Sequence, residues 1–369
     1  MKFVVFAEDW GRHPSSTQHI FKVIAEQYQV TWFNSVGMRK PKLNLTDLGR
    51  VYSKLKLMLL NKKQLSAEKL LINTRNPLIL PWHDRKWVAR FNKRQIAKQL
   101  DLSSQEPIIY WISVPTAINM IQLRPQDSLI YYCGDDFSNL AGVDPQLIQE
   151  SEARLIHQAH NIFVVSKVLL DKMPKHKTQL LEHGVDYTLF SQMKKTNSQL
   201  NSLNNIIGFY GSLSEWLDLE LLIKLAKTRP QYHLLLIGKA DIDISALVAL
   251  PNVTYLAQVA HHQLASFSQH WQVSLLPFID NGQIRACNPL KLKEYLAAGK
   301  PIVSSCFPAV ERYKDSVLIA RDHMGFIARV DYAMEISKNS SLDWRTYSQQ
   351  LVKKHSWQQK AAFVIEQLV

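Results

Sequence analysis

The sequence predicts an α/β protein with two separate sheets. Strand-like and helix-like patterns alternate from residue 2 to about residue 180, and a second alternation begins at residue 206. Between them lies the polar stretch 191–205, which has few large apolar side chains and reads as a linker. Two consecutive series joined in this way imply two facing sheets with a cleft between their carboxyl edges.

Composition narrows the class of protein. A chain of 369 residues suffices for two domains of ordinary size, and its 46% hydrophobic and 20% charged content argues against large-scale disorder. No uncharged apolar run approaches the length of about 18 residues that a membrane-spanning helix needs, and the opening reads as a strand instead of a signal peptide. The three cysteines lack CxxC spacing, so we expect neither disulfides nor a zinc site and place the protein in a reducing cytoplasm.

The loop after the first predicted strand is a candidate ligand site. Residues 2–7 form that strand, and a helix over 16–28 follows, so the loop lies at a carboxyl edge where open α/β sheets bind ligands. The loop lacks GxGxxG spacing, which disfavours a dinucleotide cofactor. Arg12, His13 and Gln18 are candidates for contacting an acceptor or a phosphate. A hydrated loop with a Ser/Thr helix cap explains the same residues.

The net charge of +13 is concentrated in one segment. Residues 39–98 contain sixteen basic residues against three acidic ones, interleaved with leucines and tryptophans. Such a segment suits peripheral contact with an anionic membrane, with apolar side chains in the bilayer and lysines at the headgroups. A helical insertion with solvated lysines is equally compatible. Nucleic acid is disfavoured because no recognised nucleic-acid motif is present.

Two adjacent aspartates end another predicted strand. Residues 128–133 are strand-like and lead into Asp135 and Asp136. A carboxylate there suits a reaction in which an acceptor hydroxyl must lose a proton or be oriented. The same pair also suits a simple turn or helix cap.

The stretch 285–305, RACNPLKLKEYLAAGKPIVSS, carries the strongest chemical pattern. Asn288 and Pro289 indicate a helix entry, and a helix is expected over 290–298, stopped by Gly299. Lys291 and Glu294 remain outside the apolar stripe on one side of the helix start, where anionic ligands are favoured. An ordinary surface ion pair explains the spacing as well.

This stretch resembles the nucleotide-sugar segment of family 4 glycosyltransferases, which have the GT-B fold of two Rossmann-like domains. IGFYGSLSEWLDLELLIKLAKTRP resembles the first strand, turn and helix of their nucleotide-binding domain, and YYCGDDFSNLAG with NIFVVSKVLLDK and LLEHGVDYTLF resembles the end of their acceptor domain. HSWQQKAAFVIEQL resembles their last helix, which crosses back to the N-terminal domain. The resemblance is strong over 206–311, moderate over 128–190 and weak over 35–105.

The resemblance implies transfer of a sugar from a nucleoside-diphosphate sugar to a glycan or lipid-linked acceptor. It also implies retention of configuration, no metal and no cofactor, and a setting in surface polysaccharide or glycolipid assembly at the inner face of the membrane. Asp135 or Asp136 would serve the acceptor side, and Lys291 would assist departure of the nucleotide. The residues expected to bind the nucleotide sugar are Gly211, Ser212, Lys239, Arg285, Asn288, Pro289, Lys291 and Glu294.

Three departures from the family pattern bear on activity. His183 stands where the family usually has Asn, and Ser212 and Asp218 occupy the region where many relatives have Arg and Lys. Ala286 replaces the first of two glutamates, so Glu294 is the only acidic residue expected at the donor site. Two alternatives therefore stay open: a nucleotide-sugar epimerase on the same fold, or a degenerate accessory protein that binds a sugar nucleotide without catalysis.

The expected domain plan follows from these matches. Residues 1–190 form an acceptor domain with the basic insertion 39–98, and 191–205 form the linker. Residues 206–342 form the nucleotide-sugar domain, and 343–369 form a helix that braces the N-terminal domain.

Overall fold

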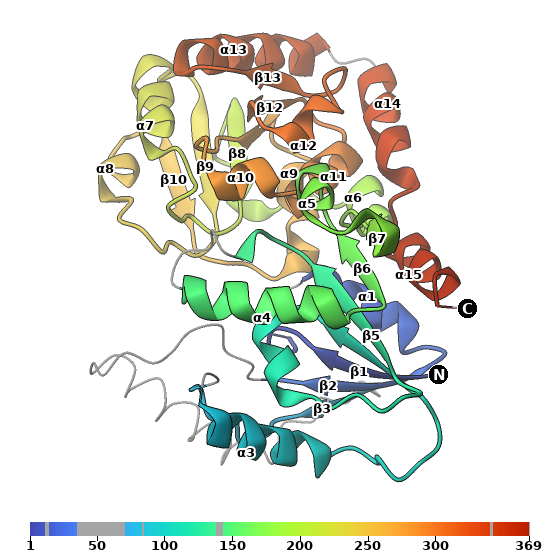
Figure 1. Ribbon diagram of the computed structural model, residues 1–369. Helices are drawn as coiled ribbons and strands as arrows, with labels where there is room; N and C mark the ends of the chain where they lie inside the picture. The colour runs from blue at the N-terminus through green and yellow to red at the C-terminus, as the bar shows by residue number, and fades with distance from the viewer. Residues whose placement is uncertain (12–14, 35–70, 83–84, 138–142, 340–341, 369) are drawn as a thin grey trace. The chain divides into compact units, whose positions relative to one another are not determined.

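Two parallel sheets organise the chain, one in each of two compact units that comprise Met1–Leu181 and Glu182–Val369 (Figure 1). The structure is a computed structural model that describes residues 1–11, 15–34, 71–82, 85–137, 143–339 and 342–368. The greater part of the expected membrane-contacting segment, including VYSKLKLMLLNKK, lies outside these residues.

The first unit has a seven-stranded sheet in the order β3-β2-β1-β4-β5-β6-β7. Its neighbouring strands pair in parallel, and the order reverses between β1 and β4, which is where open α/β sheets place ligands. The strands are β1 (Lys2–Phe6), β2 (Gln29–Phe33), β3 (Ile72–Arg75), β4 (Ile108–Ile112), β5 (Ser128–Cys133), β6 (Asn161–Val164) and β7 (Thr178–Leu180).

Helices and an aromatic core cover this sheet. The elements are α1 (Ser16–Ile24), α3 (Lys86–Ala97), the 3-10 turns η1 (Pro115–Met120) and η3 (Lys175–Lys177), α4 (Pro145–Gln158) and α5 (Lys167–Lys172). Trp111 in β4 lies 5.2 Å from Phe21 of α1 and 5.8 Å from Phe163 of β6, measured between ring centroids. Large buried rings on three elements thus join the helix layer to the sheet.

The second unit has a six-stranded parallel sheet in the order β10-β9-β8-β11-β12-β13. The order again reverses, here between β8 and β11. The strands are β8 (Ile206–Tyr210), β9 (His233–Ile237), β10 (Val253–Leu256), β11 (Val273–Leu276), β12 (Ile302–Ser305) and β13 (Leu318–Ala320). The helical elements are α6 (Tyr187–Ser191), η4 (Ser198–Leu200), α7 (Leu219–Thr228), α8 (Ser245–Val248), η5 (His261–Gln263), α9 (Ala265–Ser268), α10 (Gly282–Ala286), α11 (Leu290–Ala298), α12 (Pro308–Glu311), α13 (His323–Asn339), α14 (Leu342–Lys353) and α15 (Trp357–Glu366).

Most predicted elements are confirmed, and α11 matches its prediction at both ends. Gly299 ends this helix with a φ of 76°, a conformation that suits glycine. The predicted helix over 16–28 was too long, because α1 ends at Ile24 and a turn follows. The stretch 191–205 includes η4, and its Leu200 is buried in the core of the second unit.

The prediction of one helix over 343–369 was wrong, since the chain forms α14 and α15. The backbone between them is drawn into an extended bridge: the N–H of Val185 donates to the carbonyl of His355 at 2.9 Å, and Ser356 pairs with Val185. A continuous helix cannot supply that bridge, so Ser356 caps a new one instead. The expected bracing of the N-terminal domain and the cleft between domains stay predictions.

Within the described residues, none of the helices combines the length and the apolar character needed to cross a bilayer.

Gly208 in the middle of β8 tests the packing of the second sheet. A methyl group on it would lie 1.9 Å from Cε3 of the buried Trp271. We expect Gly208→Ala to lower the free energy of unfolding of this unit by about 1–3 kcal/mol through overpacking. Chemical denaturation measures this change in the free energy of unfolding. The control is Gly325→Ala near the start of α13, which should change that free energy by less than about 1 kcal/mol. Equal effects of the two substitutions would contradict the packing account.

Candidate functional site

Two glycine turns meet at the carboxyl edge of the second sheet. Gly211 follows β8 with a φ of 133°, and Gly238 follows β9 with a φ of 151°. The N–H of Gly211 donates to the carbonyl of Ile237 at 2.9 Å, and a Cβ on Gly238 would lie 1.9 Å from the carbonyl oxygen of Gly211. Only glycine fits both positions. The contact brings bare backbone to the sheet edge beside the strand reversal, where a ligand can approach it closely.

Lys291, in the first turn of α11, reaches directly over Gly211. Its Nζ lies 2.7 Å from the point that a Cβ on Gly211 would occupy. Three aromatic rings surround the ammonium group, with centroids 5.0 Å away for Phe209, 4.9 Å for Trp216 and 5.4 Å for Phe278. Rings at this distance attract a cation through their negative faces. Among the described residues, no carboxylate forms an ion pair with this ammonium, so its charge faces the glycine turn.

Burial lowers the pKa of Lys291 from its ordinary value to about 8, although the charges of Glu294 and Cys287 act in the opposite direction. The aromatic cage thus holds the cation where hydration is weak. An anionic ligand placed beside it would restore the preference for the charged form.

Glu294 is buried one turn further along α11. One carboxylate oxygen accepts a hydrogen bond from the hydroxyl of Tyr210 at 2.7 Å, and the other lies 2.7 Å from Nε2 of His261. The backbone N–H of Tyr210 in turn donates to the hydroxyl of Tyr295 at 3.1 Å. This network locks α11 to the end of β8. The alternative explanation of a surface ion pair between Lys291 and Glu294 is wrong, since the two side chains take up separate partners.

Two other predicted phosphate ligands are paired at the surface. Lys239 forms an ion pair with Asp241, and the guanidinium of Arg285 contacts Asp280 through two hydrogen bonds of 2.6 and 2.7 Å. Both basic side chains are more than half exposed. In this arrangement neither is aimed at the glycine turn as Lys291 is.

The remaining residues predicted at the donor site lie in the turns around α11 and Gly211. Pro289 is the N-cap of α11, Asn288 is buried beside it, and the Nζ of Lys293 donates to the side-chain oxygen of Asn288 at 3.3 Å. Ser212 has an exposed side chain next to Gly211.

Asp218, which stands in the region where relatives carry positive charge, has a structural role. Its side chain accepts a hydrogen bond from the N–H of Leu221 at 2.9 Å and so caps α7, and its other oxygen lies 2.9 Å from Nε2 of His323.

The aspartate pair of the first unit is engaged in local contacts. Asp136 is buried, and its carboxylate accepts a hydrogen bond from the Nζ of Lys172 at 2.7 Å. A side-chain oxygen of Asp135 accepts from the N–H of Asp136 at 2.9 Å. The structure therefore gives Asp136 an ion-pairing role, which the sequence pattern did not predict.

Gln18 closes the loop after β1. Its buried amide donates to Glu8 at 3.1 Å, and its oxygen accepts from the N–H of Gly11 at 3.1 Å. This arrangement orders the loop, so the expected contact of Gln18 with an acceptor competes with a structural role. Arg12 and His13 lie outside the described residues.

Comparison with known proteins decides the class of enzyme. Residues 204–335 match the family described as Glycosyl transferases group 1. Over 272 residues the chain is 26% identical to the putative teichuronic acid biosynthesis glycosyltransferase TuaH of Bacillus subtilis (strain 168), covering 67% of this chain and 68% of TuaH. The chain is a glycosyltransferase.

Solved structures show the fold of this glycosyltransferase to be GT-B. Anabaena Alr3699/HepE in complex with UDP and glucose has a TM-score of 0.68 at 12% identity and covers 100% of this chain and 99% of its own. A glycosyltransferase from Rickettsia africae ESF-5 has a TM-score of 0.67 at 11% identity, covering 99% and 97%. The predicted fold class is thereby confirmed.

Sequence reasoning missed the aromatic cage and a buried charge cluster in this glycosyltransferase. Phe209 and Trp216 do flank the glycine turn in the sequence, which is a usable signal, but Phe278 comes from a distant strand end. Lys293 is 1% exposed, and its Nζ is 3.9 Å from Glu182, which Arg312 also contacts. Lysine side chains are usually exposed, so nothing in the sequence indicated that Lys293 is buried. In the part of the chain that the structure describes, no group of three or more His, Cys, Asp or Glu side chains is arranged to hold a metal ion.

Lys293 makes the stability of the protein depend on pH. Burial lowers its pKa to about 7, while the unfolded chain keeps a value near 10.4. Between these values the unfolded state binds more protons, so this group lowers stability fully below pH 7 and less as the pH rises. We expect Lys293→Met to raise the Tm more at pH 6 than at pH 9.

The exposed Lys227 of α7 supplies the matched control. Lys227→Met should change the Tm by the same small amount at both pH values. A Tm gain for Lys293→Met that does not depend on pH would show that the lysine is not a buried charge.

Proposed function

We propose that this glycosyltransferase moves a sugar from a nucleoside-diphosphate sugar to a glycan or lipid-linked acceptor in surface polysaccharide assembly. TuaH is named for teichuronic acid biosynthesis, and the structures of HepE contain UDP, UDP and glucose, or UDP-glucose. These names support a UDP-sugar donor and a surface glycan product. We place the enzyme in the cytoplasm at the inner face of the membrane, touching it through 39–98.

The observation that carries the proposal is the position of the Lys291 ammonium over the Gly211 turn. Three features meet where the strand order reverses between β8 and β11. They are the glycine turn at Gly211, the start of the nine-residue helix α11, and the Lys291 ammonium, which forms no ion pair with a carboxylate of the described residues. A diphosphate needs such an arrangement of N–H groups and positive charge. The diphosphate therefore binds at Gly211 and Lys291, and its nucleoside extends toward Glu294.

The same arrangement serves bond breaking. As the bond between the sugar's anomeric carbon and the diphosphate oxygen breaks, negative charge grows on the leaving nucleoside diphosphate. Lys291 stabilises that charge, because a fixed cation in a weakly hydrated cage needs no reorganisation during the reaction. The acceptor oxygen bonds to the anomeric carbon, and its proton passes to the carboxylate of Asp135 or Asp136. Asp135 and Asp136 are both candidates for the acceptor side, and Lys172 contacts the carboxylate of Asp136.

Retention of configuration and independence from a resident metal or cofactor are part of this proposal. Ala286 is buried in α10, so the carboxylate that relatives place there has no counterpart at this position. Asn281 caps α10 by accepting from the N–H of Ile284 at 2.8 Å, and the backbone of this short helix is our candidate for contacting the donor sugar. A chelator should leave the transfer rate unchanged.

A thermal-shift panel with UDP, GDP, dTDP and CMP tests donor binding. A ligand that binds the folded state stabilises it by mass action, so at least one nucleotide should raise the Tm. Incubation with the matching nucleotide sugar alone, followed by NMR, separates a transferase from an epimerase, which would convert the donor without any acceptor. No shift with any nucleotide would contradict the proposed donor site.

Replacement of Lys291 tests its role in catalysis. We expect Lys291→Ala to lower kcat for transfer by about 10²–10³-fold, as loss of a charge-stabilising group does. Circular dichroism should show an unchanged fold. Lys227→Ala removes an equal charge from α7 and should keep the wild-type rate. Near-wild-type turnover by the Lys291 variant would refute the assignment.

The pH dependence of nucleotide binding follows from the pKa of Lys291, which burial lowers to about 8. Only the protonated form attracts the diphosphate, so affinity falls as the pH rises through 8. We expect about tenfold weaker binding at pH 9 than at pH 7, measured by calorimetry. Lys291→Arg keeps its charge throughout this range and should flatten the profile. An equally steep profile in the arginine variant would assign the titration to another group.

A further inference from the structure

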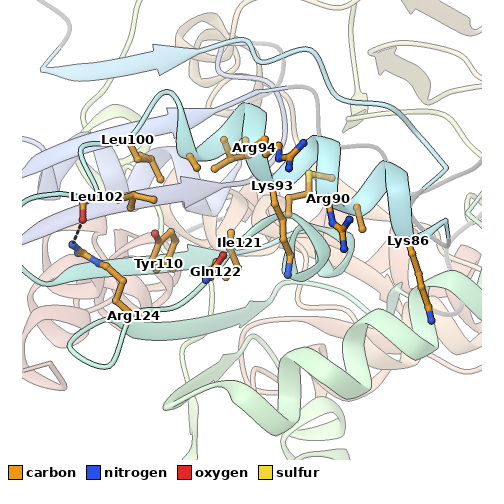
Figure 2. A pocket seen from close by; sticks show the side chains of 14 residues that line it. Lys86, Arg90, Lys93, Arg94, Leu100, Leu102, Tyr110, Ile121, Gln122 and Arg124 are labelled. Atoms are coloured by element: carbon orange, nitrogen blue, oxygen red, sulfur yellow. Dashed lines mark hydrogen bonds between the residues drawn. The ribbon is translucent and has the colours of Figure 1, made fainter.

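A groove beside α3 in the first unit combines positive charge with an apolar floor (Figure 2). Its volume is about 680 Å³, within the range of small-ligand sites. Lys86, Arg90 and Lys93 follow a spacing of four and three residues, which places them on one side of the helix, and Figure 2 shows their side chains projecting from that side. None of the predicted donor or acceptor residues lines this groove.

The charged residues that line the groove are all basic. Five of its fourteen lining residues are basic and none is acidic. The four on α3 are exposed, and they form no ion pair with any carboxylate of the described residues. Arg124 differs, because Asp127 contacts it at 2.8 Å and its guanidinium also donates to the carbonyl of Leu102 at 3.1 Å. Arg124 therefore shapes the wall, while the helix supplies the available charge.

The floor of the groove is apolar. Ile96, Met120 and Ile121 are buried and line it together with Tyr110 of β4. Ala89 and Ala97 leave the space open, since each carries only a methyl group on the groove side of α3. A ligand that fits must therefore carry an anionic group next to a hydrocarbon segment.

Exposed aromatic and aliphatic side chains border the same helix. Trp87 within α3 is 59% exposed, and Trp82 shortly before it is 38% exposed. Leu78 in the same connection is 52% exposed. Tryptophan beside basic side chains is typical of surfaces that enter the headgroup region of a membrane. This neighbourhood selects a membrane lipid among anionic amphiphiles.

We propose that the α3 groove binds one anionic phospholipid of the bilayer. The phosphate lies between Arg90 and Lys93, and the first part of an acyl chain covers Ile96 and Ile121. This proposal rests on the membrane contact proposed above. It replaces a general attraction between basic residues and an anionic membrane with a defined lipid site on α3. It is independent of the donor site around Lys291.

Soluble and membrane-bound lipids test the site in the full chain. Calorimetry with dihexanoylphosphatidylglycerol, below its micelle concentration, should show saturable binding. Dihexanoylphosphatidylcholine and inorganic phosphate should bind at least tenfold more weakly, because one lacks net charge and the other lacks a chain. Co-sedimentation with vesicles of phosphatidylglycerol and phosphatidylcholine should show binding that weakens with salt.

Two kinds of variant separate the groove from its charge. Arg90→Gln with Lys93→Gln should weaken vesicle binding by about thirtyfold, because each basic side chain contributes about 1 kcal/mol at an anionic surface. Lys224→Gln with Lys227→Gln removes the same charge at the same spacing from α7 and should change binding less than threefold. Two separate single variants, Ala97→Phe and Ala89→Phe, each fill the groove without changing its charge. Each should abolish binding of the short-chain lipid.

Three results would overturn the proposal. Short-chain phosphatidylglycerol that fails to bind while vesicles do would leave only diffuse surface attraction. The same conclusion would follow if both groove-filling variants bound the short-chain lipid normally, or if inorganic phosphate bound as tightly as the lipid. The nucleotide thermal shift in the same samples shows that each variant is folded. Loss of that shift in the wild-type protein would instead count against the proposed donor site.

Discussion

The close approach of Lys291 to Gly211 is the contact on which the proposed donor site depends. It requires a residue without a side chain at the end of β8, a second such residue at Gly238 behind it, and a helix that starts beside the strand reversal. The three rings of the aromatic cage then surround the ammonium group. Each requirement concerns how closely the elements pack. Together they place the Lys291 ammonium against the backbone of the Gly211 turn. That combination is the basis of our proposal that a site with few basic residues holds a diphosphate.

Buried polar networks hold this geometry in place. Glu294 ties α11 to Tyr210 and His261, so the helix carrying Lys291 is fixed to the end of β8. Lys293 on the same helix is also buried, near Glu182. The helix thus directs one lysine to the glycine turn and another into the protein. In the first unit, by contrast, the basic side chains of α3 remain exposed, which leaves them available to a membrane.

Local patterns predicted much of the fold. Strand β8 and helix α11 were placed at their observed ends, because apolar periodicity, Pro289 and Gly299 are local signals. The break between α14 and α15 was missed, since it depends on a bridge to Val185, which is far away in the sequence. The roles of Lys239 and Arg285 were not predictable for a related reason: each pairs with a nearby aspartate, and spacing alone does not reveal which partner a flexible side chain takes.

The sequence by itself determined the α/β class, the two series of strands and the segment around Lys291 and Glu294, because these follow from period and local residue type. Only the tertiary structure decided that Lys291 faces Gly211 inside an aromatic cage while Glu294 turns to Tyr210 and His261. The same holds for the α3 groove, whose floor combines residues of α3, β4 and the end of η1. Such arrangements join residues from separate elements, and no local pattern records which distant side chains will meet.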